Sequence, residues 1–137
     1  MKEDFTVVKE LTLSSDYQSL IEVESLVNSV CDEFGIQTDV FGNILIAVSE
    51  AVNNAIQHGN KDNQEAKVFL QVGTAPNHFY IQVKDEGAGF SFEDLPDPTA
   101  PENLLKDSGR GVFLMRNLAD EVEFLHSGNT VNLYFNK

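Results

Sequence analysis

The 137-residue sequence has little cysteine, few basic residues and no long apolar run. Cys31 is its only cysteine, so an internal disulfide is excluded, and its place in an apolar helical pattern favours a buried, unreactive thiol. Nine scattered Lys and Arg face 22 Asp and Glu, which gives a formal net charge of -13. Because no basic stripe is available to meet a phosphate backbone, we expect no nucleic-acid partner.

No segment is apolar over the length that a membrane span needs, and the first ten residues, MKEDFTVVKE, lack the apolar core of a signal peptide. We therefore expect a cytoplasmic protein that does not contact a membrane. Hydrophobic residues make up 42% of the chain, and this length can bury a core without disulfides or a structural metal. Residues 1–137 are expected to form a single domain.

Hydrophobic periodicity predicts the order of helices and strands. Residues 5–13 alternate as a strand, and a helix capped by Ser14 or Ser15 should follow and end at Gly35. A second helix should run from about Thr38 to Gly59, and its core-facing stripe comprises Phe41, Ile44, Leu45, Val48, Val52, Ala55 and Ile56. Further strands are expected at 66–73, 79–84, 121–126 and 130–135, with a short helix at 111–119. Helices on one face of a mostly antiparallel mixed sheet make a two-layer α+β sandwich.

A long irregular segment separates the third expected strand from the last helix. It covers residues 91–108 and contains Pro96, Pro98 and Pro101. Loops of this length in compact domains are usually functional lids or disordered. We expect a flexible lid here.

The expected second helix has a single charged residue between Val40 and Gln57, and that residue is Glu50. Asn54 follows four positions later, on the same helix face, so the two side chains can reach a common ligand. Ile46 and Ala47 lie near Glu50 on this outer face, which makes the face too apolar for open solvent. An ordinary solvent-facing glutamate is the alternative, but the pattern favours a pocket floor. There a carboxylate could act as a general base and an amide oxygen could hold magnesium.

Two glycine-bearing turns follow. Asp85 ends an apolar strand, where its carboxylate can accept a hydrogen bond from an exocyclic amine. Gly87 and Gly89, just after it, would let the backbone approach a flat purine closely. Each turn alone is weak evidence, because any tight reversal favours glycine.

The second turn, Gly109-Arg110-Gly111, opens the last expected helix. Helix N-termini present free amides to anions, so phosphate is the expected ligand. Lys106 and Arg110 are both placed to meet phosphoryl charge, and which of them reaches a γ-phosphate stays open.

Together these motifs resemble the ATP-binding fold shared by DNA gyrase, histidine kinases, mismatch-repair ATPases and a heat-shock chaperone, and most closely the anti-sigma-factor serine kinases. The segment EAVNNA with the following HG is similar to the N box, DEGAGF to the adenine box, and GRGVFLM to the second glycine box. The resemblance implies that Glu50 activates a substrate serine, that Asn54 binds magnesium and that Asp85 holds the adenine amino group. Asn53 stands where relatives often have threonine.

The resemblance further implies an ATP- and Mg²⁺-dependent serine/threonine kinase that binds a sigma factor and phosphorylates an anti-anti-sigma protein on serine. One alternative is a non-catalytic ATP-sensing interaction module, in which Glu50 would be incidental. Another is a plain scaffold that binds no nucleotide. Relatives commonly form homodimers, and the edge of the N-terminal strand could pair.

Overall fold

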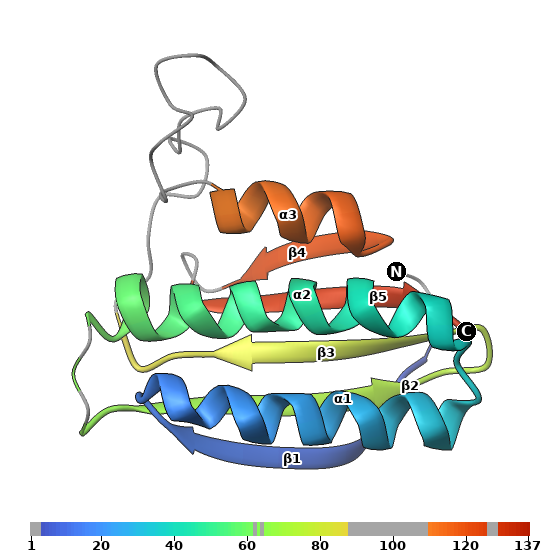
Figure 1. Ribbon diagram of the computed structural model, residues 1–137, viewed down its shortest axis with the longest axis horizontal. Coiled ribbons are helices and arrows are strands. Elements are labelled where there is room, and N and C mark those ends of the chain that lie inside the picture. Colours follow the sequence, from blue (N-terminus) through green and yellow to red (C-terminus); the bar gives the residue numbers. More distant parts are fainter. Residues whose placement is uncertain (1–3, 62, 64, 88–109, 126–128) are drawn as a thin grey trace.

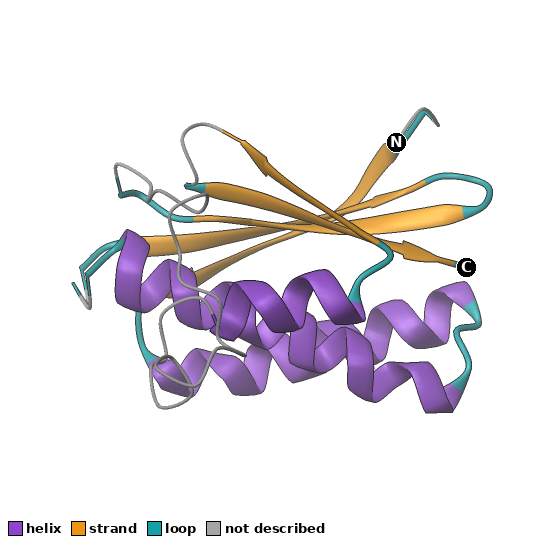
Figure 2. Cartoon of the chain, turned by 90° about the horizontal axis from the view of Figure 1, so that it is seen from above, coloured by secondary structure: helices purple, strands orange, loops and turns teal. Residues whose placement is uncertain are grey.

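The chain forms two layers, a five-stranded sheet and a layer of helices on one of its faces (Figures 1 and 2). This computed structural model describes residues 4–61, 63, 65–87, 110–125 and 129–137. The strands are β1 (Thr6–Ser14), β2 (Lys67–Thr74), β3 (His78–Lys84), β4 (Glu121–Leu125) and β5 (Thr130–Asn136), in the spatial order β1-β2-β3-β5-β4. The α+β class is confirmed, and every pairing between these strands is antiparallel, so the mixed pairing allowed for above does not occur among them. The expected lid, residues 91–108, lies outside the described residues.

The helical layer is formed by α1 (Leu20–Phe34), α2 (Thr38–Asn54) and α3 (Arg110–Leu118), with a 3-10 turn η1 (Tyr17–Ser19) before α1. The predicted caps at Ser14 and Ser15 are wrong. β1 continues through Ser14, and the Asp16 carboxylate caps η1 by accepting a hydrogen bond of 2.9 Å from the Gln18 backbone N–H. The predicted end at Gly35 is confirmed, with a left-handed φ of 66° that favours glycine.

The core lies between the layers and follows the two periodicities of the sequence. On β3, Phe79, Ile81 and Val83 are buried while the side chains between them point to the open face. On α2, most of the predicted stripe is buried, and Phe41 and Leu45 pack at its margin. Burying an apolar side chain of this size contributes about 1.5–3 kcal/mol, so the shared core is the main term that holds the two layers together.

A third helix on the layer changes the environment of the outer side of α2. Ile46 and Ala47 were both expected on an outer face too apolar for open solvent, but Ile46 is 45% exposed while Ala47 is fully buried. The reason is that α3 packs along this side of α2 (Figure 1). Small side chains at Ala47 and Ala51 allow the two helices to approach, so α2 is buried on two sides.

The open face of the sheet is held by aromatic contacts near the N-terminus. The Tyr80 ring lies over Gly73 on the neighbouring strand, in space that a Cβ at Gly73 would fill. Phe5 packs against Tyr80 and Tyr134, with ring centroids 5.2 and 5.7 Å apart. These contacts fasten the start of the edge strand β1 to β3 and β5.

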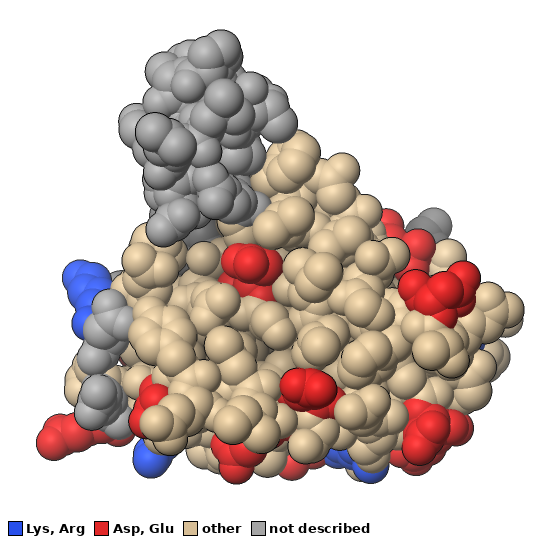
Figure 3. Space-filling model, viewed as in Figure 1, with Lys and Arg blue, Asp and Glu red and all other residues tan. Residues whose placement is uncertain are grey.

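The helical face is sparsely charged. Figure 3 shows it mostly covered by uncharged residues, with acidic side chains scattered over it and basic side chains only at its margins. Within the part of the chain that the structure describes, no helix combines the length and apolarity needed to cross a membrane.

Candidate functional site

The site begins on α2, which holds Glu50 and Asn54 one helical turn apart. Both side chains are half-buried and face the first turn of α3. A Cβ placed on Gly111 would lie 3.0 Å from Glu50 Oε2 and 3.0 Å from Asn54 Nδ2. The absence of a side chain at Gly111 therefore lets α3 start directly beside this carboxylate and amide. Two motifs that are far apart in the sequence meet here.

The C-terminal end of α2 leads toward the adenine-type motif through a widened turn. η2 (Ala55–Gly59) is a single π-helical turn, closed by a hydrogen bond of 2.7 Å from the Asn60 N–H to the Ala55 carbonyl. Such turns insert one residue into a helix and are often found at functional sites. In this chain it places Gly59 against the turn that follows β3.

Asp85 is the first residue after β3 and is 3% exposed. Its Oδ1 accepts a hydrogen bond of 2.7 Å from the Gly87 N–H. The fit with η2 is close, since a Cβ on Gly59 would overlap the Asp85 carboxylate and a Cβ on Gly87 would overlap the Gly59 carbonyl oxygen. Both glycines are thus needed for close approach, and neither has a positive φ.

Burial dominates the electrostatics of this carboxylate. Loss of solvent raises the pKa of Asp85 above its ordinary value, and the Gly87 N–H lowers it by a smaller amount. In the folded protein, the hydrogen bond from Gly87 therefore offsets only part of the cost of burying the charged Asp85 carboxylate. A ligand that donates a hydrogen bond to it would stabilise that charged form.

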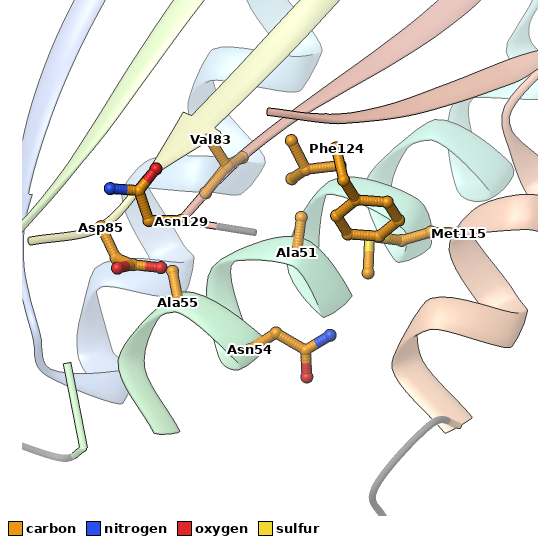
Figure 4. A pocket seen from close by; sticks show the side chains of 9 residues that line it. Ala51, Asn54, Ala55, Val83, Asp85, Met115, Phe124 and Asn129 are labelled. Carbon is orange, nitrogen blue, oxygen red and sulfur yellow. The ribbon is translucent and has the colours of Figure 1, made fainter. Parts of the chain in front are cut away.

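A small pocket lies between the two regions, lined from one side by Asn54 and from the other by Asp85. Figure 4 shows Asp85 and Asn129 at one end of it and Met115 and Phe124 at the other. Its lining consists of Ala51, Asn54, Ala55, Val83, Asp85, Met115, Phe124, Asn129 and Val131. Apolar walls with a few convergent polar groups are typical of small-molecule sites.

Asn129 is a site residue that sequence reasoning missed. Its carbonyl accepts the Asp85 N–H at 2.9 Å, and its Nδ2 donates to the Gly87 carbonyl at 3.4 Å. Buried Thr130 donates through Oγ1 to Asn129 Oδ1 at 3.0 Å. The sequence showed Asn129 only as a turn residue before a strand, and nothing local indicated that it supports Asp85.

The structure places five of the predicted site residues. Glu50, Asn54 and Gly111 lie together, Asp85 lines the pocket that Asn54 also lines, and Gly87 lies against Asp85 and Gly59. Gly89, Lys106 and Gly109 fall outside the described residues. Arg110 begins α3, but its side chain is also outside the description.

The donor set fits magnesium only in part. Among the side chains that the structure describes, no three His, Cys, Asp or Glu residues are grouped to hold a metal ion. The amide oxygen of Asn54, a pocket-lining residue, could serve as one hard oxygen ligand. Magnesium bound with a nucleotide commonly uses one or two protein ligands and takes the remaining oxygens from phosphates and water, and Asn54 fits that arrangement.

Comparison with known proteins agrees with this geometry. The profile of a family described as histidine kinase-like ATPase domain matches residues 13–135. The chain belongs to this ATPase family and, within it, to the anti-sigma serine kinases, as the three motifs predicted.

Two relatives illustrate the similarity. Serine-protein kinase RsbW of Bacillus subtilis is 33% identical over 112 residues, which cover 77% of this chain and 70% of that protein. Serine-protein kinase RsbW of Staphylococcus aureus is 31% identical over 140 aligned positions, which cover 96% of this chain and 86% of that protein. A solved Mycobacterium tuberculosis protein containing RsbU and RsbW domains matches with a TM-score of 0.62 at 17% identity, over 94% of this chain and 32% of that chain. The latter likeness supports the fold alone.

Proposed function

We propose that this chain is an ATP-dependent serine/threonine protein kinase of the anti-sigma type, which binds a partner such as a sigma factor and phosphorylates an antagonist protein on serine. The activity class is that of its family. The observation that favours catalysis is the convergence of Glu50, Asn54 and the start of α3 beside a pocket that Asn54 lines together with the buried acceptor Asp85.

The pocket is proposed to take the adenine base. Asp85 would accept a hydrogen bond from the exocyclic amine, while Met115, Phe124 and the other apolar walls contact the ring. Gly87 and Gly89 are assigned to the close approach of backbone and base. The raised pKa of Asp85 supports this role, because an amine donor would offset the cost of burying its charge.

The phosphates are proposed to lie beside the start of α3. Backbone amides of the Gly109-Arg110-Gly111 turn would bind them, with Lys106 and Arg110 as candidate basic partners. Asn54 would hold magnesium, which when bound would offset negative charge on the phosphates. Because Asn54 supplies a single protein ligand, the metal and the nucleotide are expected to bind together.

Glu50 is the proposed catalytic residue. Its carboxylate would accept the proton of the substrate serine hydroxyl while the hydroxyl oxygen forms a bond to the γ-phosphorus. The bond from that phosphorus to the bridging oxygen breaks, and ADP leaves. Positioning of the hydroxyl does most of the work in phosphoryl transfer. The location of half-buried Glu50 beside Gly111 and one turn from pocket-lining Asn54 supports this role.

The test compares Glu50→Gln with the native chain in binding and in transfer. Glutamine keeps the size of the side chain but cannot take the proton, so ATP binding should stay within about twofold while phosphoprotein formation falls by about 100-fold or more. Glu24→Gln, an exposed glutamate on α1, is the matched control and should change neither. Equal transfer rates in Glu50→Gln and the native chain would refute the assignment. Nucleotide-dependent partner binding without any phosphoprotein would instead favour an ATP-sensing module.

The proposal extends to assembly and cellular location. β1 lies at one edge of the sheet, and Val7 and Val8 on it are exposed, so antiparallel pairing of two β1 strands would build a homodimer. Light scattering of the native chain and of Val8→Lys would test this pairing. We further propose that residues 1–137 act as one ATPase domain in the cytoplasm, where ATP is available.

A further inference from the structure

Asn60 is a buried polar residue outside all three sequence motifs, and each of its polar groups has a hydrogen-bond partner. It follows the π-helical turn η2 and is 6% exposed. Its Nδ2 donates to Ser15 Oγ at 2.7 Å and to the Lys67 carbonyl at 2.9 Å. Its Oδ1 accepts the Glu86 backbone N–H at 2.8 Å. One side chain thus joins the end of β1, the start of β2 and the turn that follows β3.

The bond to Glu86 bears directly on the proposed adenine site, because Glu86 follows Asp85. The Asp85 N–H is held by the Asn129 carbonyl at 2.9 Å, and the next N–H along the chain is held by Asn60. Consecutive amides of the turn are therefore fixed by two different segments. The Gly87 N–H then fixes the carboxylate of Asp85 itself.

The π-helical turn is what brings Asn60 to this position. An α-helix advances about 100° per residue, so one inserted residue rotates everything after it by that amount. With the Asn60 N–H bonded to the Ala55 carbonyl, the Asn60 side chain points between Ser15 and Glu86. The same chain segment has Asn54 at the start of the turn, so the turn links the proposed magnesium ligand to the adenine acceptor.

We infer that Asn60 is a positioning residue for adenine recognition: its side-chain oxygen holds the Glu86 amide and so sets where the Asp85 carboxylate meets the base. This inference rests on the proposed nucleotide site. Asn60 itself does not line the pocket beside Asp85, so its effect on the ligand is exerted through the turn. A hydrogen bond is strongly directional, and a small displacement of the Asp85 acceptor weakens it.

The test measures the preference for ATP over inosine triphosphate, whose base has a carbonyl oxygen in place of the amino group. Dissociation constants are measured by calorimetry in magnesium buffer, at a temperature where circular dichroism shows each variant folded. In Asn60→Ala the Glu86 N–H loses its partner and the turn loosens. The affinity for ATP, and with it the ATP preference, should fall about tenfold, as expected for one displaced hydrogen bond. The affinity for inosine triphosphate should change less.

Controls separate positioning from general stability. Ser15→Ala removes one partner of Asn60 but leaves the bonds to Lys67 and Glu86, so it should lower stability and keep the ATP preference. Asn60→Asp keeps an oxygen for the Glu86 N–H, and the Ser15 hydroxyl can donate to its second oxygen, but the Lys67 carbonyl loses its donor. This variant should therefore be less stable than the native chain and still keep the ATP preference. If Asn60→Ala does not fold, Asn60→Gln keeps the amide but displaces it by one methylene, and should also reduce the preference.

The outcomes discriminate between the two proposals. A native chain that binds neither nucleotide overturns the proposed function. A native chain that prefers ATP, with the same preference in the folded Asn60→Ala or Asn60→Gln variant, overturns the role of Asn60 and leaves the proposed function standing. An equal loss of affinity for ATP and for inosine triphosphate in the variant also overturns the role of Asn60, because loss of a purely structural residue would lower both affinities alike.

Discussion

The contact between Gly87 and Gly59 gives the sharpest prediction from the structure. A Cβ on Gly87 would overlap the Gly59 carbonyl oxygen and lie 3.0 Å from Asp85 Oδ1. The main obstacle is backbone on an adjacent helical turn, so it cannot be relieved by rotating a side chain. Gly87→Ala must therefore move the turn after β3 away from η2, and Asp85 moves with it.

The size of the effect follows from the packing. Inserting one methyl group into a well-packed site costs about 1–3 kcal/mol, and a rigid obstacle places this case toward the upper end. At this chain length such a loss lowers the melting temperature by roughly 4–10 °C. ATP affinity should fall by at least about tenfold, because the carboxylate that is proposed to hold the adenine amine is displaced.

Gly42→Ala is the matched control. Gly42 is an exposed residue within α2, and a Cβ there would meet nothing within 4 Å. Replacing a helical glycine with alanine stabilises a protein by about 0.5–1 kcal/mol. Gly42→Ala should therefore raise the free energy of unfolding, whereas Gly87→Ala should lower it. Urea unfolding and calorimetric ATP titration of both variants provide the assay. A Gly87→Ala protein as stable as the native chain, with unchanged ATP affinity, would refute the close packing of the turn on η2.

Two further predictions concern titratable groups. Burial raises the pKa of Asp85 in the folded state above its value in the unfolded state. The stability that protonated Asp85 contributes is therefore fully present below the unfolded pKa and is lost as the pH rises through the folded pKa. In urea unfolding without nucleotide, Asp85→Asn should therefore gain stability relative to the native chain as the pH rises above about 4, the ordinary pKa of aspartate, and a difference that does not change with pH would contradict this. Burial, with a smaller effect from Asp32, raises the pKa of the Cys31 thiol, so Cys31 should react slowly with a thiol reagent at pH 8 in the folded protein and rapidly in urea. Equal rates in the two conditions would show that the thiol is not buried.

Much of the fold could be predicted because periodicity records which side of each element is buried. The stripe on α2 and the alternation on β3 both identified the core correctly. The position of α3 was not predictable in the same way. Ala47 reads as part of an outer face because nothing in a local pattern shows that a helix 60 residues later will cover it. The predicted cap of the first helix was wrong for a similar reason, because the Ser15 hydroxyl accepts a hydrogen bond from Asn60, which is distant in the sequence.

The site was predictable where a residue type is unusual for its surroundings. Glu50 in an apolar helix and Asp85 at the end of an apolar strand are both conspicuous in the sequence. Asn129 and Asn60 were missed because asparagine is ordinary in turns, and their roles depend on partners that are remote in the sequence, such as Gly87 and Glu86. The residues that we propose to touch a ligand can thus be recognised locally, while those proposed to position them need the tertiary structure.

The burial of Asp85 links stability to ligand choice. The Asp85 carboxylate is nearly inaccessible, and its Oδ1 accepts a hydrogen bond from the Gly87 N–H, but burial outweighs this bond and raises its pKa. A ligand that donates a hydrogen bond to Asp85 would lower that pKa and be bound more tightly when the carboxylate is ionised. A ligand that presents an acceptor instead would raise the pKa further and be disfavoured. The burial that makes the Asp85 charge unfavourable would therefore also make the site prefer an amino group to a carbonyl. The strength of that preference depends on how rigidly Asn60, Asn129, Gly59 and Gly87 hold the turn after β3.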